Sequence, residues 1–139
     1  MAKIQQAKNI SFDLWRRAND SGFPETMISV MANRFKLLSE PMRLKLIAAL
    51  KDGEKSVGEL VAQTDAGQPN VSKHLTALLQ GGIVSRRKQG TTIYYSISDN
   101  AIIELCDLVC SSAQRNAVEQ ALAIGATSDY STELDTKIK

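Results

Sequence analysis

The 139-residue sequence has few of the residues that mark membrane, secreted or catalytic proteins, with one histidine, two cysteines and no long apolar run. A membrane-spanning helix needs about 20 consecutive apolar residues, and the polar opening of the chain lacks the apolar core of a secretory signal. Two cysteines four positions apart do not build the disulfide framework of a small secreted domain. We therefore expect a cytoplasmic protein that does not associate with membranes.

Groups that carry catalysis or bind metal are equally scarce. The single histidine, His74, cannot serve two remote roles, no Ser/His/Asp set is available, and no glycine-rich phosphate loop follows a predicted strand. Zinc-type sites use three or four nitrogen or sulfur ligands, and this sequence offers no such cluster. We therefore expect no enzymatic activity, no metal site and no cofactor, with one exception left open, a thiophilic ion held by the two cysteines.

The composition is that of a folded domain, with 43% hydrophobic and 23% charged residues. The net charge of +2 is near balance but unevenly distributed, because residues 68–98 contain four Lys or Arg and no acid. In residues 119–139, by contrast, acids outnumber bases. We interpret the chain as an N-terminal extension with a short helix (1–23), one domain (24–123) and a flexible C-terminal tail (124–139).

Apolar residues at helical spacing predict five helices in this domain. Ser56 and Glu59 form the reciprocal capping pattern that starts a helix, and Pro24 and Pro41 suit the first turns of two others. The first helix is expected to bury a face made of Met27, Val30, Met31, Phe35 and Leu38. The predicted helices span about 24–39, 41–50, 56–63, 68–80 and 100–123, and two strands at 83–88 and 92–97 form a hairpin.

The predicted helix at 68–80 has two chemically different faces. Val71, Leu75, Leu78 and Leu79 recur at helical spacing and predict a buried face. The opposite face is expected to be solvated and can donate or accept hydrogen bonds. It comprises Gln68, Asn70, Ser72, Lys73, His74 and Thr76.

A short helix, a turn, an amphipathic helix and a basic hairpin form the order of a winged helix-turn-helix, whose second helix enters the major groove of DNA. On the hairpin, Arg86, Arg87 and Lys88 would neutralise phosphates, or they are solvated charges on an edge strand. A winged-helix module that binds a protein partner is the competing function. The predicted DNA contacts are Gln68, Asn70, Ser72, Lys73, His74, Thr76, Arg86, Arg87, Lys88, Gln89 and Thr91.

Several short motifs follow one another along the chain: LLSEPMRL at 37–44, VGEL at 57–60, QPNVSKHL at 68–75 and GTTIYY at 90–95. In this order they resemble the ArsR/SmtB-type bacterial transcriptional repressors. The resemblance implies a mainly α fold with a small β-hairpin wing (α+β), and a homodimer held by its first and last helices. It also implies a palindromic double-stranded DNA operator, which the repressor leaves when a small inducer binds.

Metal-sensing members of this family carry cysteines in the helix before the DNA-reading helix, or Asp and His pairs on the last helix. This chain has ELVA at 59–62 and no histidine in its last helix, so it lacks both patterns. Cys106 and Cys110 share one helix face, with Cβ atoms about 5 to 6 Å apart. They could sense an oxidant, reactive sulfur or a thiophilic ion, or they could simply pack in the dimer seam. The residues alone leave both interpretations open.

Overall fold

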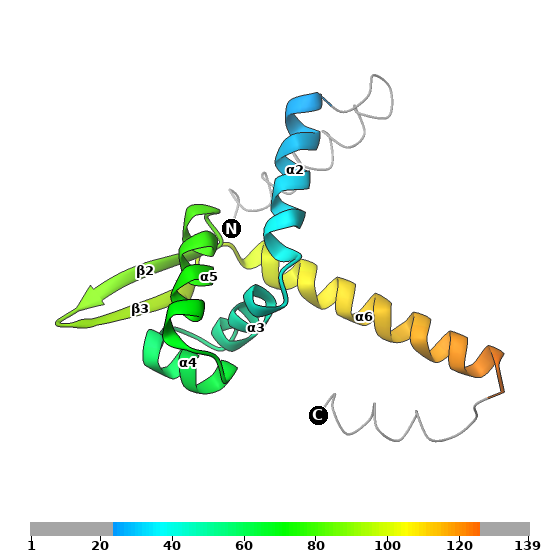
Figure 1. Cartoon of the computed structure of the whole chain (residues 1–139). Coiled ribbons are helices and arrows are strands. Elements are labelled where there is room, and N and C mark those ends of the chain that lie inside the picture. Colours follow the sequence, from blue (N-terminus) through cyan, green and yellow to red (C-terminus); the bar gives the residue numbers. More distant parts are fainter. Residues whose placement is uncertain (1–23, 126–139) are drawn as a thin grey trace, which may run out of the picture.

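The computed structural model describes residues 24–125, and the expected leading helix and most of the expected tail lie outside this range. All five predicted helices and both predicted strands are present, together with a short strand that was not predicted (Figure 1). The elements are α2 (Glu25–Leu38), α3 (Pro41–Leu50), β1 (Lys55–Ser56), α4 (Val57–Thr64), α5 (Gln68–Gln80), β2 (Val84–Gln89), β3 (Thr92–Ile97) and α6 (Asn100–Ala123).

Local signals set most of the helix boundaries. The Ser56 side chain accepts from the Glu59 N–H, and the Glu59 carboxylate accepts from the Ser56 N–H, so the predicted capping box of α4 is confirmed. Asp99 caps α6 by accepting from the Ala101 N–H. After α5 the chain turns at Gly81, where a Cβ would collide with the Leu37 side chain. The two caps are local contacts, whereas the close approach of Gly81 to Leu37 joins residues far apart in the sequence.

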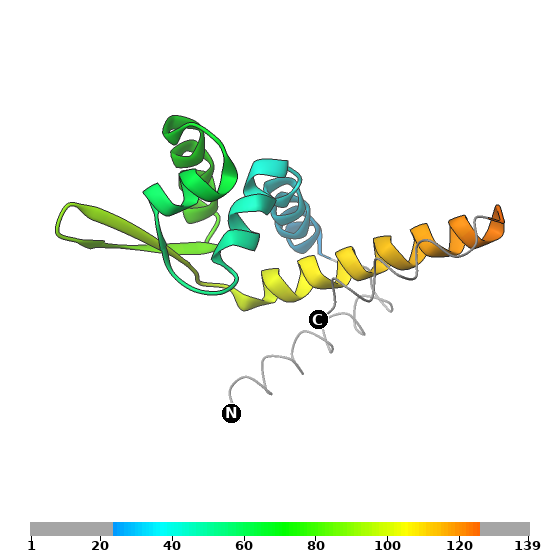
Figure 2. The same ribbon diagram turned by 90° about the horizontal axis from the view of Figure 1, so that it is seen from below.

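The sheet is antiparallel with strand order β1-β3-β2. Two residues of β1 pair with β3, and they are too few to show the alternation by which a strand is recognised in a sequence. The β2–β3 register places Arg86 opposite Tyr95 and Arg87 opposite Tyr94. The hairpin extends from one side of the helical body as the wing (Figures 1 and 2).

A single hydrophobic core lies between α3, α4, α5 and the base of the hairpin. On α3 the buried side chains are Leu46, Ile47 and Leu50, whereas Leu44 and Ala48 are exposed. The other core residues are Leu38, Leu60, Val71, Leu75, Leu78, Ile83, Val84, Tyr95 and Ile102.

The faces of α2 and α6 are largely uncovered in the single chain. The prediction of a buried α2 face is wrong for this subunit, because Leu38 is its only buried residue and Phe35 is 52% exposed. Similarly, α6 projects from the body (Figure 2) and exposes Val109 and Leu122. Within residues 24–125, no helix combines the length and apolar content that a bilayer crossing requires. Isolated helices are marginal in water, so these apolar faces call for a covering surface.

Candidate nucleic-acid interface

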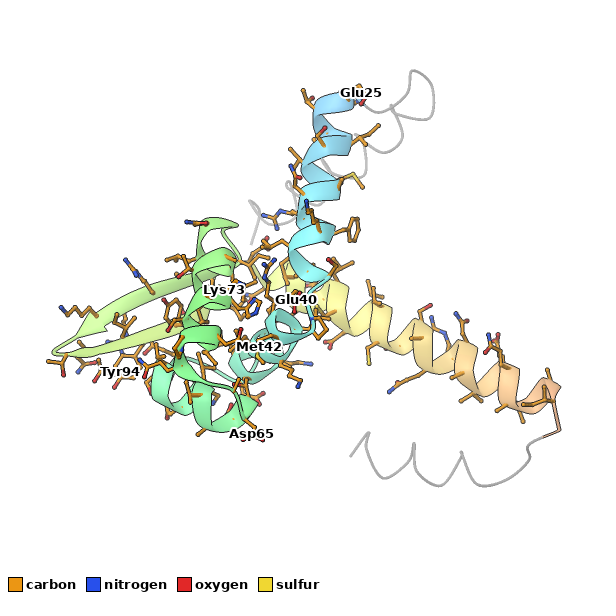
Figure 3. The ribbon with its side chains drawn as sticks, in the orientation of Figure 1. Glu25, Glu40, Met42, Asp65, Lys73 and Tyr94 are labelled. Atoms are coloured by element: carbon orange, nitrogen blue, oxygen red, sulfur yellow. The ribbon has the colours of Figure 1, made fainter. Side chains whose placement is uncertain are left out.

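The outer face of α5 presents hydrogen-bonding side chains without any acid. Gln68, Asn70, Lys73 and Thr76 belong to this face, and Ser72 is half-buried. The opposite face is fixed in the core by Val71, Leu75 and Leu78. Lys73 is labelled on this helix in Figure 3. The predicted two-faced character of the helix is therefore confirmed, and its polar side is available to a ligand.

His74 differs from this pattern. It was predicted to be a solvated residue of the polar face, but it is only 8% exposed, so that prediction is wrong. The reason is helical spacing, because Val71, His74, Leu75 and Leu78 follow i, i+3, i+4 and i+7 and share the buried face. Its Nδ1 accepts a hydrogen bond from Arg43 Nε at 3.3 Å.

The three wing cations point to opposite sides of the hairpin. Residues paired directly across two antiparallel strands share a face, so Arg86 lies on the face of the buried Tyr95 and Arg87 on the face of Tyr94. Lys88, two residues after Arg86, shares its face. Arg86 and Lys88 are exposed and form no salt bridge with another described residue. They are the cations available to an external anion.

Arg87 is engaged within the chain. Its Nε donates to both carboxylate oxygens of Glu54 at 3.0 and 2.8 Å, its Nη1 donates to Gln89 Oε1 at 2.8 Å, and its guanidinium carbon lies 4.7 Å from the Tyr94 ring centre. The hydrogen bonds from Arg87 hold the pKa of Glu54 below its ordinary value, and Glu54 raises the pKa of Arg87. Glu54 precedes β1, so the pair spans the three-stranded sheet and braces the wing.

Gly90, with a positive φ, and Thr91 complete the exposed tip of the hairpin.

An apolar groove of about 640 Å³ lies where the end of α2 meets α3 and α6. Phe35, Leu44 and Val109 line it, together with both cysteines. Cys106 is half-buried. Its burial raises the pKa of its thiol, and the negative charge of the nearby Asp107 carboxylate raises it further. Cys110 is exposed, and both thiols are free. The described residues contain no group of three or more His, Cys, Asp or Glu side chains suited to a metal ion.

The sequence model of the family described as "Bacterial regulatory protein, arsR family" matches residues 40–86, which run from the start of α3 into β2. The Biofilm growth-associated repressor of Xylella fastidiosa is 38% identical over 93 residues, which cover 67% of this chain and 73% of that protein. This chain belongs to the ArsR family of bacterial regulatory proteins. ArsR-type transcriptional repressors are thus its relatives, and the resemblance seen in the sequence motifs is confirmed.

Solved structures agree with this ArsR-family assignment. The Mycobacterium tuberculosis protein Rv0081 has a TM-score of 0.65 at 28% identity, with 70% of this chain and 99% of that one covered. A homodimeric winged helix-turn-helix DNA-binding domain from Mycobacterium bovis has a TM-score of 0.61 at 28% identity, with 70% and 93% covered. The predicted winged helix-turn-helix fold is therefore confirmed.

Three side chains of the interface were not singled out from the sequence of this ArsR-family protein. Arg43 contacts His74, 31 residues away along the chain, and Glu54 contacts Arg87, 33 residues away, so no local sequence pattern indicates either contact. Tyr94 was recognised only as a strand residue. The position of Arg87 on the opposite face of the strand from Arg86 and Lys88, in contrast, follows from the twofold periodicity of a strand and could have been inferred from the sequence.

Proposed function

We propose that this ArsR-family protein is a homodimeric repressor that binds duplex DNA through α5 and the wing. The observation that carries the proposal is the outer face of α5, a row of polar side chains beside the exposed cations of the hairpin, with no acid anywhere in residues 68–98. Amide, hydroxyl and ammonium groups pair with base edges and phosphates, and exposed cations release counterions from DNA.

The second copy is proposed to cover the exposed apolar faces of α2 and α6. A twofold dimer places two recognition helices about 34 Å apart, in successive major grooves of a palindromic operator. The 24-residue length of α6 gives a helix long enough to hold two subunits apart on that scale. The homodimeric relative from Mycobacterium bovis supports this arrangement.

Within the interface, we assign different roles to neighbouring residues. Arg86 and Lys88 are proposed phosphate contacts, whereas Arg87 supports the wing because Glu54 already neutralises it. His74 is removed from the proposed contacts because it is buried. The remaining contacts are Gln68, Asn70, Ser72, Lys73 and Thr76 on α5, with Gln89 and Thr91 at the wing tip.

Salt titration of DNA binding tests both the function and these roles. The Arg86→Gln/Lys88→Gln variant should show a shallower decline of log affinity with log salt, by about 0.9 for each phosphate that is no longer neutralised. Arg87→Gln is the matched control, since it removes the same type of side chain from the same strand. It should leave the salt slope almost unchanged. Binding would be measured by fluorescence anisotropy on promoter fragments against random competitor.

Two outcomes would contradict these assignments at different levels. A slope that flattens as much for Arg87→Gln as for the double variant would show that the bracing role of Arg87 is wrong. No preference for any promoter fragment over random DNA would contradict the function itself and favour a winged-helix module that binds a protein.

For the inducer, we propose a thiophilic species that acts at Cys106 and Cys110. Both thiols line the apolar groove that the second copy is proposed to cover, so a bridging group would alter the packing of α6. A direct disulfide within the helix requires Cβ atoms about 3.8 Å apart, closer than i and i+4 positions allow, whereas a bridging arsenic or sulfur chain avoids this distortion.

Single Cys106→Ser and Cys110→Ser variants test this proposal. Each should bind DNA as the wild type does but stay bound when arsenite or polysulfide is added. Release of the wild type should be faster at higher pH, because the raised pKa of Cys106 leaves few thiolates near neutrality. If both variants release DNA like the wild type, the cysteines are packing residues only, and intact mass spectrometry would show whether any adduct had formed.

A further inference from the structure

The end of α2 meets the recognition helix at a joint centred on Leu37. The Leu37 side chain is half-buried and lies against Gly81 at the end of α5, where a Cβ atom would collide with it. The Leu37 carbonyl accepts a hydrogen bond from Arg43 Nη1 at 3.0 Å. The rest of α2 stands away from the body of the chain (Figure 1). The last turn of α2 is therefore the part through which this helix and α5 affect each other.

Arg43, a half-buried residue of α3, connects the two other helices through one guanidinium. Its Nη1 donates to Leu37 in the last turn of α2, and its Nε donates to His74 Nδ1 on α5 at 3.3 Å. Carbonyls in the last turn of a helix have no partner within the helix, and the negative end of the helix dipole favours a cation there. In the described part of the chain, no carboxylate forms a salt bridge with Arg43. Its hydrogen bonds therefore serve the two helices rather than an acid.

Apolar packing alone leaves the rotation of α5 loosely determined. Val71, Leu75 and Leu78 decide which face turns to the core, but apolar contacts have no preferred direction, whereas hydrogen bonds do. Among the side chains of α5 in the described structure, only His74 hydrogen-bonds to another helix. The donors of a guanidinium lie in one rigid plane, so a bond to each neighbour fixes the orientation of α5 relative to the end of α2.

Small errors in this rotation matter for reading bases. Side-chain tips lie about 5 to 6 Å from a helix axis, so a rotation of about 20° displaces them by about 2 Å, which exceeds the distance range of a hydrogen bond. Contacts to phosphates are less sensitive, because charge attraction falls off gradually with distance. A misaligned α5 would therefore lose its preference for a particular sequence before it loses general affinity for DNA.

We propose that Arg43 is a positioning residue for operator recognition, which holds the polar face of α5 in a fixed orientation relative to the end of α2. This inference rests on the proposed DNA-binding function. Because α2 is also a helix of the proposed dimer, the same joint relates the recognition helix of each subunit to the twofold axis. Arg43 acts through α5 and not by contacting DNA.

Arg43→Met keeps the apolar stem and removes both donors. Its preference for the promoter fragment that the wild type binds best, relative to random DNA, should fall about tenfold, the size of one hydrogen bond to a charged group. Its affinity for random DNA should change little. A purely structural role would lower both affinities together, because it would reduce the fraction of binding-competent protein. Lys45→Gln removes an exposed cation from the same helix, so it is the control for loss of charge and should behave like the wild type.

Arg43→Lys separates the bridge between the helices from the charge. It keeps a cation but replaces the planar guanidinium with one point-like ammonium, so we expect it to lose the sequence preference as Arg43→Met does. Thermal unfolding would identify a variant that does not fold, and Arg43→Lys carries the test if Arg43→Met is unfolded. Full sequence preference in either folded variant would overturn the positioning role.

A measurement without DNA separates this inference from the proposed function. Residual dipolar couplings of the backbone amides, measured by NMR on the free protein, report the orientation of α5 relative to α2 and α3. The wild type should fit one fixed arrangement, and in both Arg43 variants the couplings of α5 should no longer fit it. Unchanged couplings in the variants would overturn the positioning role. If the couplings change but the wild type prefers no promoter fragment, Arg43 still orients α5 and the DNA-binding function fails.

Discussion

Val109→Lys is expected to convert the dimer into monomers and to abolish operator binding at working concentrations. The side chain is 59% exposed in the single chain and lines the apolar groove with Phe35 and Leu44. If the second subunit covers this surface, each dimer would bury two unpaired ammonium groups, and burying an unpaired charge is strongly unfavourable. Size-exclusion chromatography with light scattering would report the change in mass.

The loss of DNA affinity should be large because, in the proposed dimer, two half-sites are read by one linked pair of recognition helices. Linking two binding modules commonly strengthens binding by about 10² to 10⁴-fold, and monomers bind without this increase in affinity. Ser111→Lys is the matched control, since it adds the same side chain on the same helix at an exposed polar position outside the groove. A Val109→Lys protein that remains dimeric would show that the dimer uses another surface.

Leu75→Ala is expected to have the largest effect on stability. Leu75 is 0% exposed and lies on the face of α5 that packs into the core. Truncating a buried leucine removes its burial energy and leaves a cavity, at a cost of about 2 to 5 kcal/mol. Small domains are stable by only about 5 to 15 kcal/mol, so this reduction is a large part of the total. Urea unfolding followed by circular dichroism, at a fixed protein concentration, would measure it.

The neighbouring Thr76→Ala serves as the control for this substitution. Thr76 is exposed, and its hydroxyl only donates to the Ser72 carbonyl of the same helix at 2.9 Å. We expect its free energy of unfolding to change by about 0.5 kcal/mol or less, as for most surface sites. Equal destabilisation by the two substitutions would mean that the core does not lie where the structure places it.

The fold was predictable from the sequence where local chemistry decides it. The capping box at Ser56, Pro41 in the first turn of α3 and the strand pair around Gly90 all lie within a few residues of the boundary they set. Burial was less predictable. Phe35 sits at core-like spacing on α2 yet is exposed in the subunit. A face that meets a second chain, as we propose for α2, has the same apolar periodicity as a face that meets the core.

In the candidate site, too, some features follow from local sequence and others depend on contacts between distant residues. The polar face of α5 follows from helical spacing, and only His74, on the border between its two faces, was placed wrongly. The wing cations were recognised by charge, but charge alone does not show which of them is already paired. The partner of Arg87 is Glu54, 33 residues away in the sequence, and only the folded sheet brings the two together.

The two helices with uncovered apolar faces, α2 and α6, stand at either end of the described chain, and each contributes one buried side chain, Leu38 or Ile102, to the core between them. If a second copy covers these faces as we propose, substitutions at their exposed positions would change which subunits associate without altering the polar face of α5. In a cell that makes several paralogues of this fold, the choice between self-association and mixed pairs would be encoded in α2 and α6. Such choices depend on clashes with wrong partners as much as on contacts with the right one.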